Sequence, residues 1–281
     1  MFDYIKLFLQ EKETASTIFK RNLVKEYLQV LILSFLYSHE NYRNLVFYGG
    51  SSLRHCYGLP RLSEDLDFVD IEKRIHLIGM AEDLRKFFAN KYRIKVDAKV
   101  QKFRCTLKFP ILHVLNLASP QESNLLFSKI EVYSEFGFCK EYGTEVKPLF
   151  KFGEALLLRT FDLPTLMATK IRAIMHRKWE RTTKNGGILA EVKGRDYYDL
   201  MWYLEQGAKP NLRCIEGISD EHKLYEELIK IVRRINPQSI KYDLEGLIED
   251  PGFLDTLKDN IKEVLISLLK KRLHFGATRQ K

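Results

Sequence analysis

Apolar residues in the first part of the chain follow the spacing of a helix in some segments and of a strand in others. Residues 13–39 carry them at intervals of three and four, which predicts one or two helices. The most apolar stretch, residues 27–37, is well short of the roughly 18 residues that cross a bilayer, so it predicts a buried helix. Residues 45–49 form a short apolar run typical of a strand, and residues 51–58 predict a helix that ends at Gly58.

The following segments continue this mixture of patterns. The sequence DLDFVD at residues 65–70 alternates polar and apolar positions, as a strand does. Residues 72–90 predict an amphipathic helix. Residues 92–100 and 102–112 predict a pair of strands, and residues 129–136 predict one more.

Beyond about residue 160 the pattern becomes helical. Asp162 is placed to cap a helix whose first turn contains Pro164, and further helices are predicted over residues 194–207, 220–235 and 253–272. The sequence therefore predicts an α+β fold. A small mixed sheet with helices would occupy residues 1–155, and a helical domain would occupy residues 156–281.

Composition and charge narrow the class of protein. Hydrophobic residues make up 45% and charged residues 30%, as in soluble globular proteins. The N-terminus lacks the pattern of a signal peptide and no segment is apolar for long enough to span a membrane, so we expect a cytoplasmic protein. The four cysteines are far apart without CxxC spacing, which predicts free thiols rather than disulfides or a zinc site. The net charge of +9 favours a polyanionic partner such as nucleic acid, nucleotides or an acidic protein, although a merely basic surface would give the same charge.

The strongest candidate chemistry lies on the strand predicted at residues 65–70. Asp65 and Asp67 are two residues apart, so their side chains point to the same face of that strand. Two carboxylates placed in this way can bind a hard cation such as Mg²⁺, which prefers oxygen ligands. In nucleotidyl transfer, bound metal ions stabilise the attacking and the leaving oxygen. A DxD pair alone is common on protein surfaces and is weak evidence for a metal site. The segment that precedes residues 65–70 makes the whole pattern more specific.

That preceding segment is GGSSL, which directly follows the strand predicted at residues 45–49. Gly49 and Gly50 allow phosphate to approach the backbone closely, and the N-terminus of the next helix offers free N–H groups to an anion. Ser51 can add a hydroxyl donor. The segment therefore predicts a phosphate site close to the aspartate pair.

Glu131 is the candidate for a third carboxylate. It lies in the middle of a predicted strand between Ile130 and Val132, and its side chain faces with those of Lys129 and Tyr133. The alternative is that Glu131 simply lies on the solvent face of the sheet.

Taken together, these elements resemble the signature of the DNA polymerase β-like nucleotidyltransferase superfamily. More narrowly, the chain resembles the AbiEii/AbiGii-type toxin nucleotidyltransferases of bacterial type IV toxin–antitoxin and phage-defence systems. The GGTAL segment of that family corresponds to GGSSL, and its R-x-S-x-D-h-D-F stretch corresponds to residues 61–68. Its helix lysine corresponds to Lys170, and its RD-x-x-D element corresponds to Arg195, Asp196 and Asp199. The resemblance covers roughly residues 20–205.

The resemblance implies a polymerase β-like core and a role for each matching residue. Asp65, Asp67 and Glu131 would bind the metal ion, Mg²⁺ or Mn²⁺, with Glu131 alternatively acting as the base that activates a hydroxyl. Lys170 would bind the triphosphate and Asp196 would be a further active-site acid, so the helical domain would contribute to the site. The third carboxylate is Glu rather than Asp, which changes its reach by one methylene. The nucleotide-binding residues would be Lys170 together with Gly49, Gly50, Ser51, Ser52, Arg61 and Ser63.

Several of these residues also have a purely structural interpretation. Lys170 lies among basic residues on its predicted helix, so a solvated face is the alternative to a phosphate contact. Asp196 alternatively only stabilises the N-terminus of its helix, and Arg61 and Ser63 either contact phosphate or fix their loop. The basic run at residues 176–184 and the basic C-terminal tail are either RNA contacts or solvated segments.

The resemblance, together with the basic charge of the chain, implies a metal-dependent nucleotidyltransferase toxin. It would transfer a nucleoside monophosphate from an NTP to RNA, with the 3′ end of tRNA as the expected acceptor, and so arrest growth. Its expected partners are the NTP, the RNA and a cognate antitoxin protein. The alternatives are a nucleotide- or RNA-binding module with weak or no transfer activity, and nucleotidyl transfer to a protein or a small molecule.

Overall fold

The computed structural model divides the chain into two compact units. The N-terminal unit comprises Met1–Phe136 and Thr144–Phe161, and the C-terminal unit comprises Gly137–Gly143 and Asp162–Lys281. The described residues are 1–137, 139–177, 181–182, 188–190 and 192–274. None of the helices formed by these residues combines the length and the apolar character that a membrane span requires.

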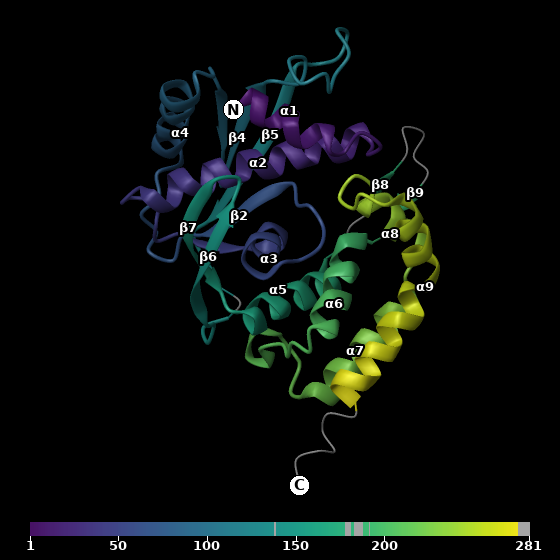
Figure 1. The fold of residues 1–281 in the computed structure, drawn as a ribbon. Coiled ribbons are helices and arrows are strands. Elements are labelled where there is room, and N and C mark those ends of the chain that lie inside the picture. The colour runs from purple at the N-terminus through teal and green to yellow at the C-terminus, as the bar shows by residue number, and fades with distance from the viewer. Residues whose placement is uncertain (138, 178–180, 183–187, 191, 275–281) are drawn as a thin grey trace. The chain divides into compact units, whose positions relative to one another are not determined.

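The N-terminal unit is built on a seven-stranded mixed sheet (Figure 1). Its strand order is β3-β4-β5-β2-β1-β7-β6. The pairs β2–β5 and β1–β7 are parallel, and the other neighbouring strands are antiparallel. The strands are β1 (Val46–Tyr48), β2 (Asp65–Val69), β3 (Asp97–Gln101), β4 (Arg104–Pro110), β5 (Leu125–Tyr133), β6 (Thr144–Lys151) and β7 (Glu154–Phe161).

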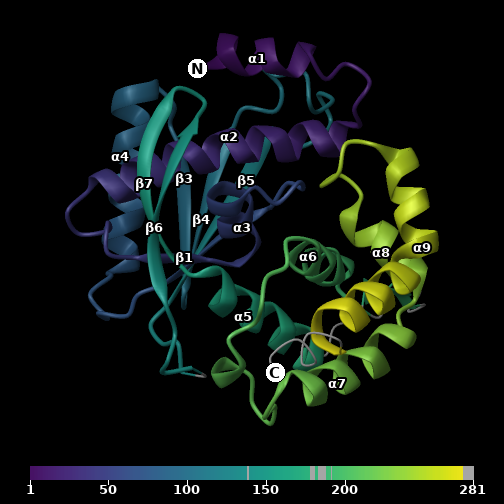
Figure 2. The same ribbon diagram turned by 60° about the horizontal axis from the view of Figure 1, so that its bottom comes forward.

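Four helices belong to this unit: α1 (Phe2–Gln10), α2 (Thr17–Ser38), α3 (Gly49–Tyr57) and α4 (Leu77–Tyr92). In Figure 2, α2 runs across the strands and α4 lies beside them. Ser16 caps α2, because its side chain accepts a hydrogen bond from the backbone N–H of Phe19. The apolar residues of α2 and α4 share one hydrophobic core with Leu66 and Phe68 of β2. Since side chains alternate along a strand, Asp65 and Asp67 point away from this core.

The C-terminal unit is largely helical. Asp162 caps its first helix, because its Oδ1 accepts a hydrogen bond of 2.9 Å from the backbone N–H of Thr165. Helix α6 packs against α5, α8 and α9, and α7 packs against α9. The helices are α5 (Leu163–His176), α6 (Gly194–Glu205), α7 (Glu221–Arg233), α8 (Pro237–Leu244) and α9 (Pro251–Leu269), with short strands β8 (Arg181–Thr182) and β9 (Ile188–Ala190).

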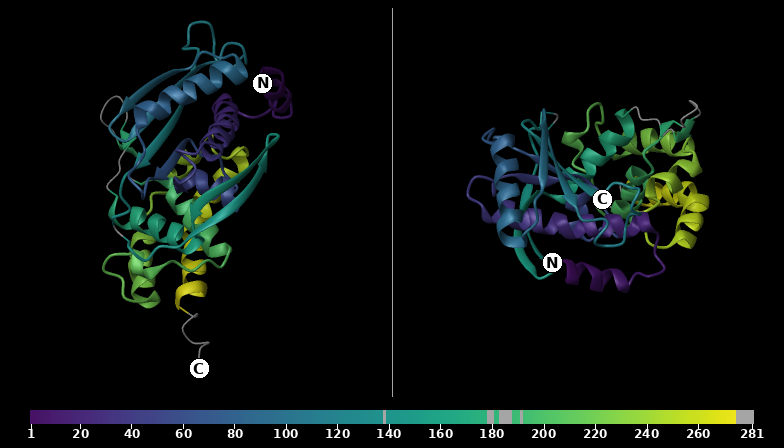
Figure 3. Two further views of the ribbon diagram at one scale, coloured as in Figure 1. Left: turned by 90° about the vertical axis from the view of Figure 1, so that its left-hand side faces the viewer. Right: turned by 90° about the horizontal axis from the view of Figure 1, so that it is seen from above.

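The fold class predicted from the sequence is confirmed, one local prediction is wrong, and one pair of strands was not predicted. The strand predicted at residues 92–100 does not begin at residue 92. Helix α4 extends to Tyr92, and Arg93 then adopts the left-handed conformation that ends the helix. The β6–β7 hairpin, which extends as a long two-stranded ribbon in the left view of Figure 3, is absent from the sequence prediction. Its exposed face is apolar, with Val146, Phe150 and Leu157 all largely exposed, so the usual alternation of buried apolar and exposed polar positions is lost.

The cysteines require a further correction. Cys139 and Cys214 form a disulfide across 75 residues of sequence, whereas the sequence predicts four free thiols. The short segment Gly137–Gly143 belongs to the C-terminal unit, and this brings Cys139 to the turn that contains Cys214. Sequence spacing does not reveal such a pair, because the fold alone decides whether two distant cysteines come close enough to bond. Cys56 and Cys105 are not disulfide-bonded.

Candidate functional site

Three carboxylates lie side by side on the face of the sheet that points away from the α2–α4 core. Asp67 of β2 is opposite Tyr48 of β1 on one side and opposite Glu131 of β5 on the other. Asp65 is opposite Lys129 of β5. Directly opposed residues on neighbouring strands point to the same face, and neighbouring strands are about 4.8 Å apart. We call Asp65, Asp67 and Glu131 the acidic row.

The glycine segment lies directly against this row. Gly49 begins α3 with a φ of +77°, and a Cβ atom built on it would come within 2.4 Å of Oδ2 of Asp67. A Cβ atom on Gly50 would come within 2.7 Å of Nη2 of Arg61. Gly49 therefore requires glycine, because its φ is positive and Asp67 occupies the space that a side chain needs, whereas a side chain at Gly50 would have to displace the end of Arg61.

The polar residues around the glycines have mostly structural contacts. Ser52 is fully buried, and its Oγ lies 2.7 Å from Oγ1 of Thr160. Ser51 is also fully buried, so its hydroxyl group is not exposed to a ligand in this conformation. Arg61 is buried and donates a hydrogen bond of 2.8 Å to the carbonyl oxygen of Leu62.

These contacts favour the loop-fixing interpretation of Arg61. Ser63 also belongs to this packed loop, since it is buried and its carbonyl oxygen accepts a hydrogen bond of 2.9 Å from Gln29. The nucleotide-binding roles of Ser51, Ser52, Arg61 and Ser63 stay predictions. The backbone at Gly49 and Gly50 is the part of the segment best placed to meet a phosphate.

Both carboxylate oxygens of Glu131 are engaged within the sheet. Arg104 of β4 lies opposite Glu131 and approaches Oε1 with Nε at 2.7 Å and with Nη2 at 2.5 Å. The hydroxyl group of Tyr133 donates a hydrogen bond of 2.6 Å to Oε2. Burial and the contact with Glu131 raise the pKa of Tyr133 above its ordinary value. Glu131 therefore accepts hydrogen bonds from two donors, Arg104 and Tyr133.

The acidic row fits a metal ion only in part. Asp65 and Asp67 supply hard carboxylate oxygens from one strand face, which suits a divalent cation that takes its remaining ligands from phosphate and water. Glu131 fits less well, because the guanidinium group of Arg104 already compensates its charge. Within the described part of the chain, no group of three or more His, Cys, Asp or Glu side chains is arranged to hold a metal ion. The predicted set of three ligands thus stays a prediction, and Asp65 and Asp67 are its best-placed members.

A second polar cluster forms within the C-terminal unit. Nζ of Lys170 on α5 lies 2.7 Å from Oδ1 of Asp196 and 2.7 Å from Oδ2 of Asp199, both on α6. Nη1 of Arg177 lies 2.9 Å from Oδ2 of Asp196. Burial alone would raise the pKa of Asp196, but the positive charges of Lys170 and Arg177 outweigh it and lower that pKa. The structure thus brings together Lys170, Asp196 and Asp199, and the solvated-face interpretation of Lys170 does not apply.

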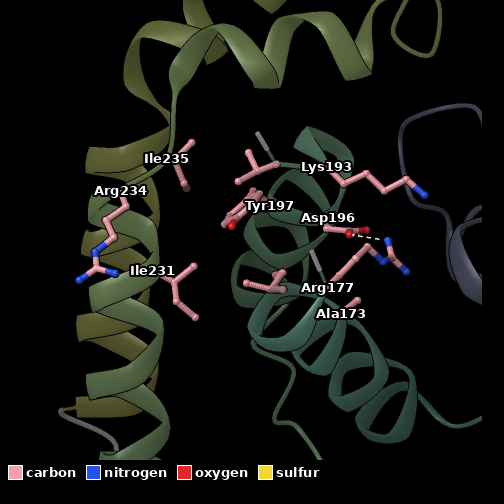
Figure 4. Close-up of a pocket in the computed structure, with 10 residues that line it drawn as sticks. Ala173, Arg177, Lys193, Asp196, Tyr197, Ile231, Arg234 and Ile235 are labelled. Atoms are coloured by element: carbon pink, nitrogen blue, oxygen red, sulfur yellow. Dashed lines mark hydrogen bonds and ion pairs between the residues drawn. The ribbon is translucent and has the colours of Figure 1, made fainter. Parts of the chain in front are cut away.

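A pocket of about 250 Å³ adjoins this cluster and is lined by residues of α5, α6 and α7. Figure 4 shows Ile231 and Ile235 pointing across to Tyr197, while Arg177 lies beside Asp196. Burial and the nearby positive charges lower the pKa of Lys193, which also lines the pocket. Sequence reasoning missed this pocket, because only the tertiary fold places Ile231 of α7 opposite Tyr197 of α6.

Two predicted RNA contacts fall largely outside the described residues. The basic run at residues 176–184 is described only in part, and the C-terminal tail is described only as far as residue 274. Sequence reasoning also missed Arg104. Its spacing from the acidic motif carries no signal, because it reaches Glu131 only through the pairing of β4 with β5.

The mixed sheet, the helix that begins at Gly49 and the aspartate pair agree with the nucleotidyltransferase class to which the family match assigns the chain. The sequence model described as "Nucleotidyl transferase AbiEii toxin, Type IV TA system" matches residues 34–277. The chain therefore belongs to the AbiEii nucleotidyltransferase toxin family of type IV toxin–antitoxin systems, which confirms the resemblance seen in the sequence. This family membership implies a nucleotide substrate and an antitoxin partner.

Two solved structures are similar to this chain at low sequence identity. The crystal structure of JHP933 from Helicobacter pylori is 19% identical with a TM-score of 0.48, and the match covers 92% of this chain and 98% of JHP933. A second H. pylori protein, provisionally described as a nucleotidyltransferase, is 17% identical with a TM-score of 0.47, over 89% of this chain and 96% of that protein. No curated protein matched the sequence.

Proposed function

We propose that this nucleotidyltransferase depends on a divalent metal ion and transfers a nucleoside monophosphate from an NTP to the 3′-terminal hydroxyl group of RNA, with tRNA as the acceptor. The observation that carries the proposal is the position of Asp65 and Asp67 on one strand face, with Asp67 packed against Gly49 at the start of α3. Because tRNA is a cytoplasmic acceptor, the proposal also assigns the enzyme to the cytoplasm.

The aspartate pair and the helix start have complementary roles in this proposal. Asp65 and Asp67 would hold Mg²⁺ or Mn²⁺, which stabilises the negative charge that develops on the phosphate oxygens during transfer. The N–H groups of the first turn of α3 would bind phosphate oxygens, since the N-terminus of a helix offers N–H groups without a partner inside the helix to an anion. A side chain at either glycine would displace the residues that form the site.

The cluster of the C-terminal unit is proposed to act in the same reaction. Asp196 and Asp199 each lie 2.7 Å from Nζ of Lys170 and would orient this positive charge toward a phosphate group. Asp196 is ionised at neutral pH, because its pKa is lowered. It would therefore orient Lys170 or accept a proton from the attacking hydroxyl group, and it would not donate one.

The acceptor is tested by offering the purified enzyme α-labelled NTPs and total RNA, with and without prior periodate oxidation of the RNA. Oxidation destroys the terminal 2′,3′-diol and leaves internal hydroxyl groups intact. We expect label on untreated RNA, chiefly on tRNA, and none on oxidised RNA. Label on the protein or on a small molecule would replace the RNA proposal. Nucleotide binding without any transfer would favour a binding module.

A further inference from the structure

Two partly exposed cations flank the acidic row on its own face of the sheet. Lys129 of β5 lies opposite Asp65, and Arg104 of β4 lies opposite Glu131. Their side chains retain 43% and 40% exposure, so both charged groups are open to solvent. This face therefore places two aspartates on β2 next to two accessible positive charges on β4 and β5.

Arg104 is held rigidly but only part of its hydrogen-bonding capacity is used. A guanidinium group has five N–H donors in a fixed plane. Nε and Nη2 contact the same oxygen of Glu131, and among the described residues the guanidinium group has no other hydrogen-bond partner. Glu131 is itself held in place, because Tyr133 donates a hydrogen bond to its second carboxylate oxygen. Tyr133 in turn stacks on Phe103, with the ring centroids 4.7 Å apart. A rigid guanidinium group with unused donors is well suited to phosphate.

Lys129 is held more loosely. Its Nζ lies 3.5 Å from Oδ1 of Asp65, which is a longer separation than a good charge-assisted hydrogen bond. When Asp65 serves as a ligand for a cation, that carboxylate attracts Lys129 less, and the ammonium group can turn to a neighbouring anion. The phosphates of a nucleotide are such an anion.

We propose that Arg104 and Lys129 form a phosphate-binding subsite for the triphosphate of the nucleotide substrate, and that Glu131 positions Arg104. This inference rests on the proposed function of the acidic row. A triphosphate remains negatively charged after it binds one divalent cation, and Asp65 and Asp67 add two further negative charges beside it. Cations on the same face offset this repulsion. The subsite lies entirely within the N-terminal unit and is separate from the role proposed for Lys170.

The test measures binding of inorganic tripolyphosphate in the presence of Mg²⁺ by calorimetry, since this probe does not depend on the identity of the base. The variants are Arg104→Gln, Lys129→Gln and their combination. The matched control is Lys108→Gln, which removes a cation four residues from Arg104 on the same face of β4. We expect each single variant to weaken binding about tenfold, the value of one lost charge-assisted contact, and the control to stay within about twofold of the wild type. Binding of an RNA oligonucleotide without a terminal phosphate should not change.

Glu131→Gln separates positioning from metal binding. If Glu131 positions Arg104, this variant weakens tripolyphosphate binding by about threefold at saturating Mg²⁺, and Arg104→Lys, which keeps the charge without the planar group, behaves similarly. A higher Mg²⁺ requirement in Glu131→Gln, with full binding once Mg²⁺ saturates, would overturn the positioning role. Thermal unfolding of each variant identifies any that is misfolded, and Arg104→Lys then takes the place of Arg104→Gln.

The subsite and the proposed function fail in distinguishable ways. Unchanged tripolyphosphate binding in the folded double variant would overturn the subsite, whatever the wild type transfers. Loss of RNA binding with tripolyphosphate binding intact would also overturn it, because the two cations would then serve the acceptor. A wild type that binds tripolyphosphate through Arg104 and Lys129 but labels no acceptor would support the subsite and contradict the proposed transfer.

Discussion

Gly49 lies so close to Asp67 that a Cβ atom on the glycine would come within 2.4 Å of a carboxylate oxygen. Gly49→Ala therefore displaces Asp67 and also strains a backbone with a φ of +77°. We expect transfer activity to fall more than tenfold and the free energy of unfolding to fall by about 1–2 kcal/mol. Initial rates and chemical denaturation measure the two effects.

Gly58→Ala is the matched control for that variant. Gly58 has a φ of +79°, but no atom lies within 4 Å of a Cβ atom built on it. The backbone strain is thus the same and the collision with Asp67 is absent. Activity of Gly58→Ala should stay within about twofold of the wild type after a similar loss of stability. Equal losses of activity in both variants would mean that the contact with Asp67 is unimportant.

The buried ion pairs of Glu26 should make the stability of the protein depend on pH. It is buried between Arg54, at 2.6 Å, and Lys151, at 2.9 Å. Burial acts to raise its pKa, but the two cations outweigh burial and lower it. A lowered pKa gives stability that is present above the ordinary value of about 4.3 and is lost as pH falls through the lowered pKa. Glu26→Gln should lower the free energy of unfolding at pH 7 by on the order of 2 kcal/mol and flatten its decline in acid. Exposed Glu82→Gln should change neither quantity.

The ion pairs of Lys170 allow its effect on stability to be separated from its proposed effect on transfer activity. Lys170→Met leaves the buried carboxylates of Asp196 and Asp199 without their shared cation and should destabilise the protein by about 3 kcal/mol. Adding Asp199→Asn removes one excess negative charge and should restore most of that loss. Transfer should stay absent in the double variant, because the donor to phosphate is still missing. Recovery of transfer together with stability would show that Lys170 is only structural.

The disulfide between Cys139 and Cys214 predicts a sensitivity to reductant. Its removal, by reduction or by Cys139→Ser, should lower the free energy of unfolding by about 2–4 kcal/mol. Cys56→Ser serves as the control, because Cys56 is not disulfide-bonded. Thiol labelling of the denatured protein under non-reducing conditions gives the number of free cysteines. Four reactive thiols in the oxidised protein would contradict the disulfide.

The sequence predicted what short-range patterns encode. Alternation along residues 65–70 placed Asp65 and Asp67 on one face, and the turn at Gly49 placed a helix start before them. Strand geometry likewise placed the side chain of Glu131 with those of Lys129 and Tyr133, while its link to Asp65 and Asp67 came from the family resemblance. These features depend on neighbours in the chain, so a single sequence carries them.

Features that depend on long-range pairing escaped prediction. Arg104 reaches Glu131 only because β4 pairs with β5 in one register, and nothing near residue 104 specifies that register. The disulfide of Cys139 has the same cause, since a short segment joins the C-terminal unit from within the N-terminal part of the chain. The hairpin of β6 and β7 escaped because its exposed face is apolar.

The central claim is that Asp65 and Asp67 carry metal-dependent nucleotidyl transfer. The most direct measurement is the rate at which the Asp67→Asn variant transfers label from NTP to RNA. The control is Glu64→Gln, which also removes one negative charge, at the residue next to Asp65. The account predicts a loss on the order of a thousandfold in Asp67→Asn, activity within a few-fold of the wild type in Glu64→Gln, and no wild-type transfer after chelation until Mg²⁺ or Mn²⁺ is restored. A folded Asp67→Asn variant that transfers label at a rate close to the wild type would contradict it.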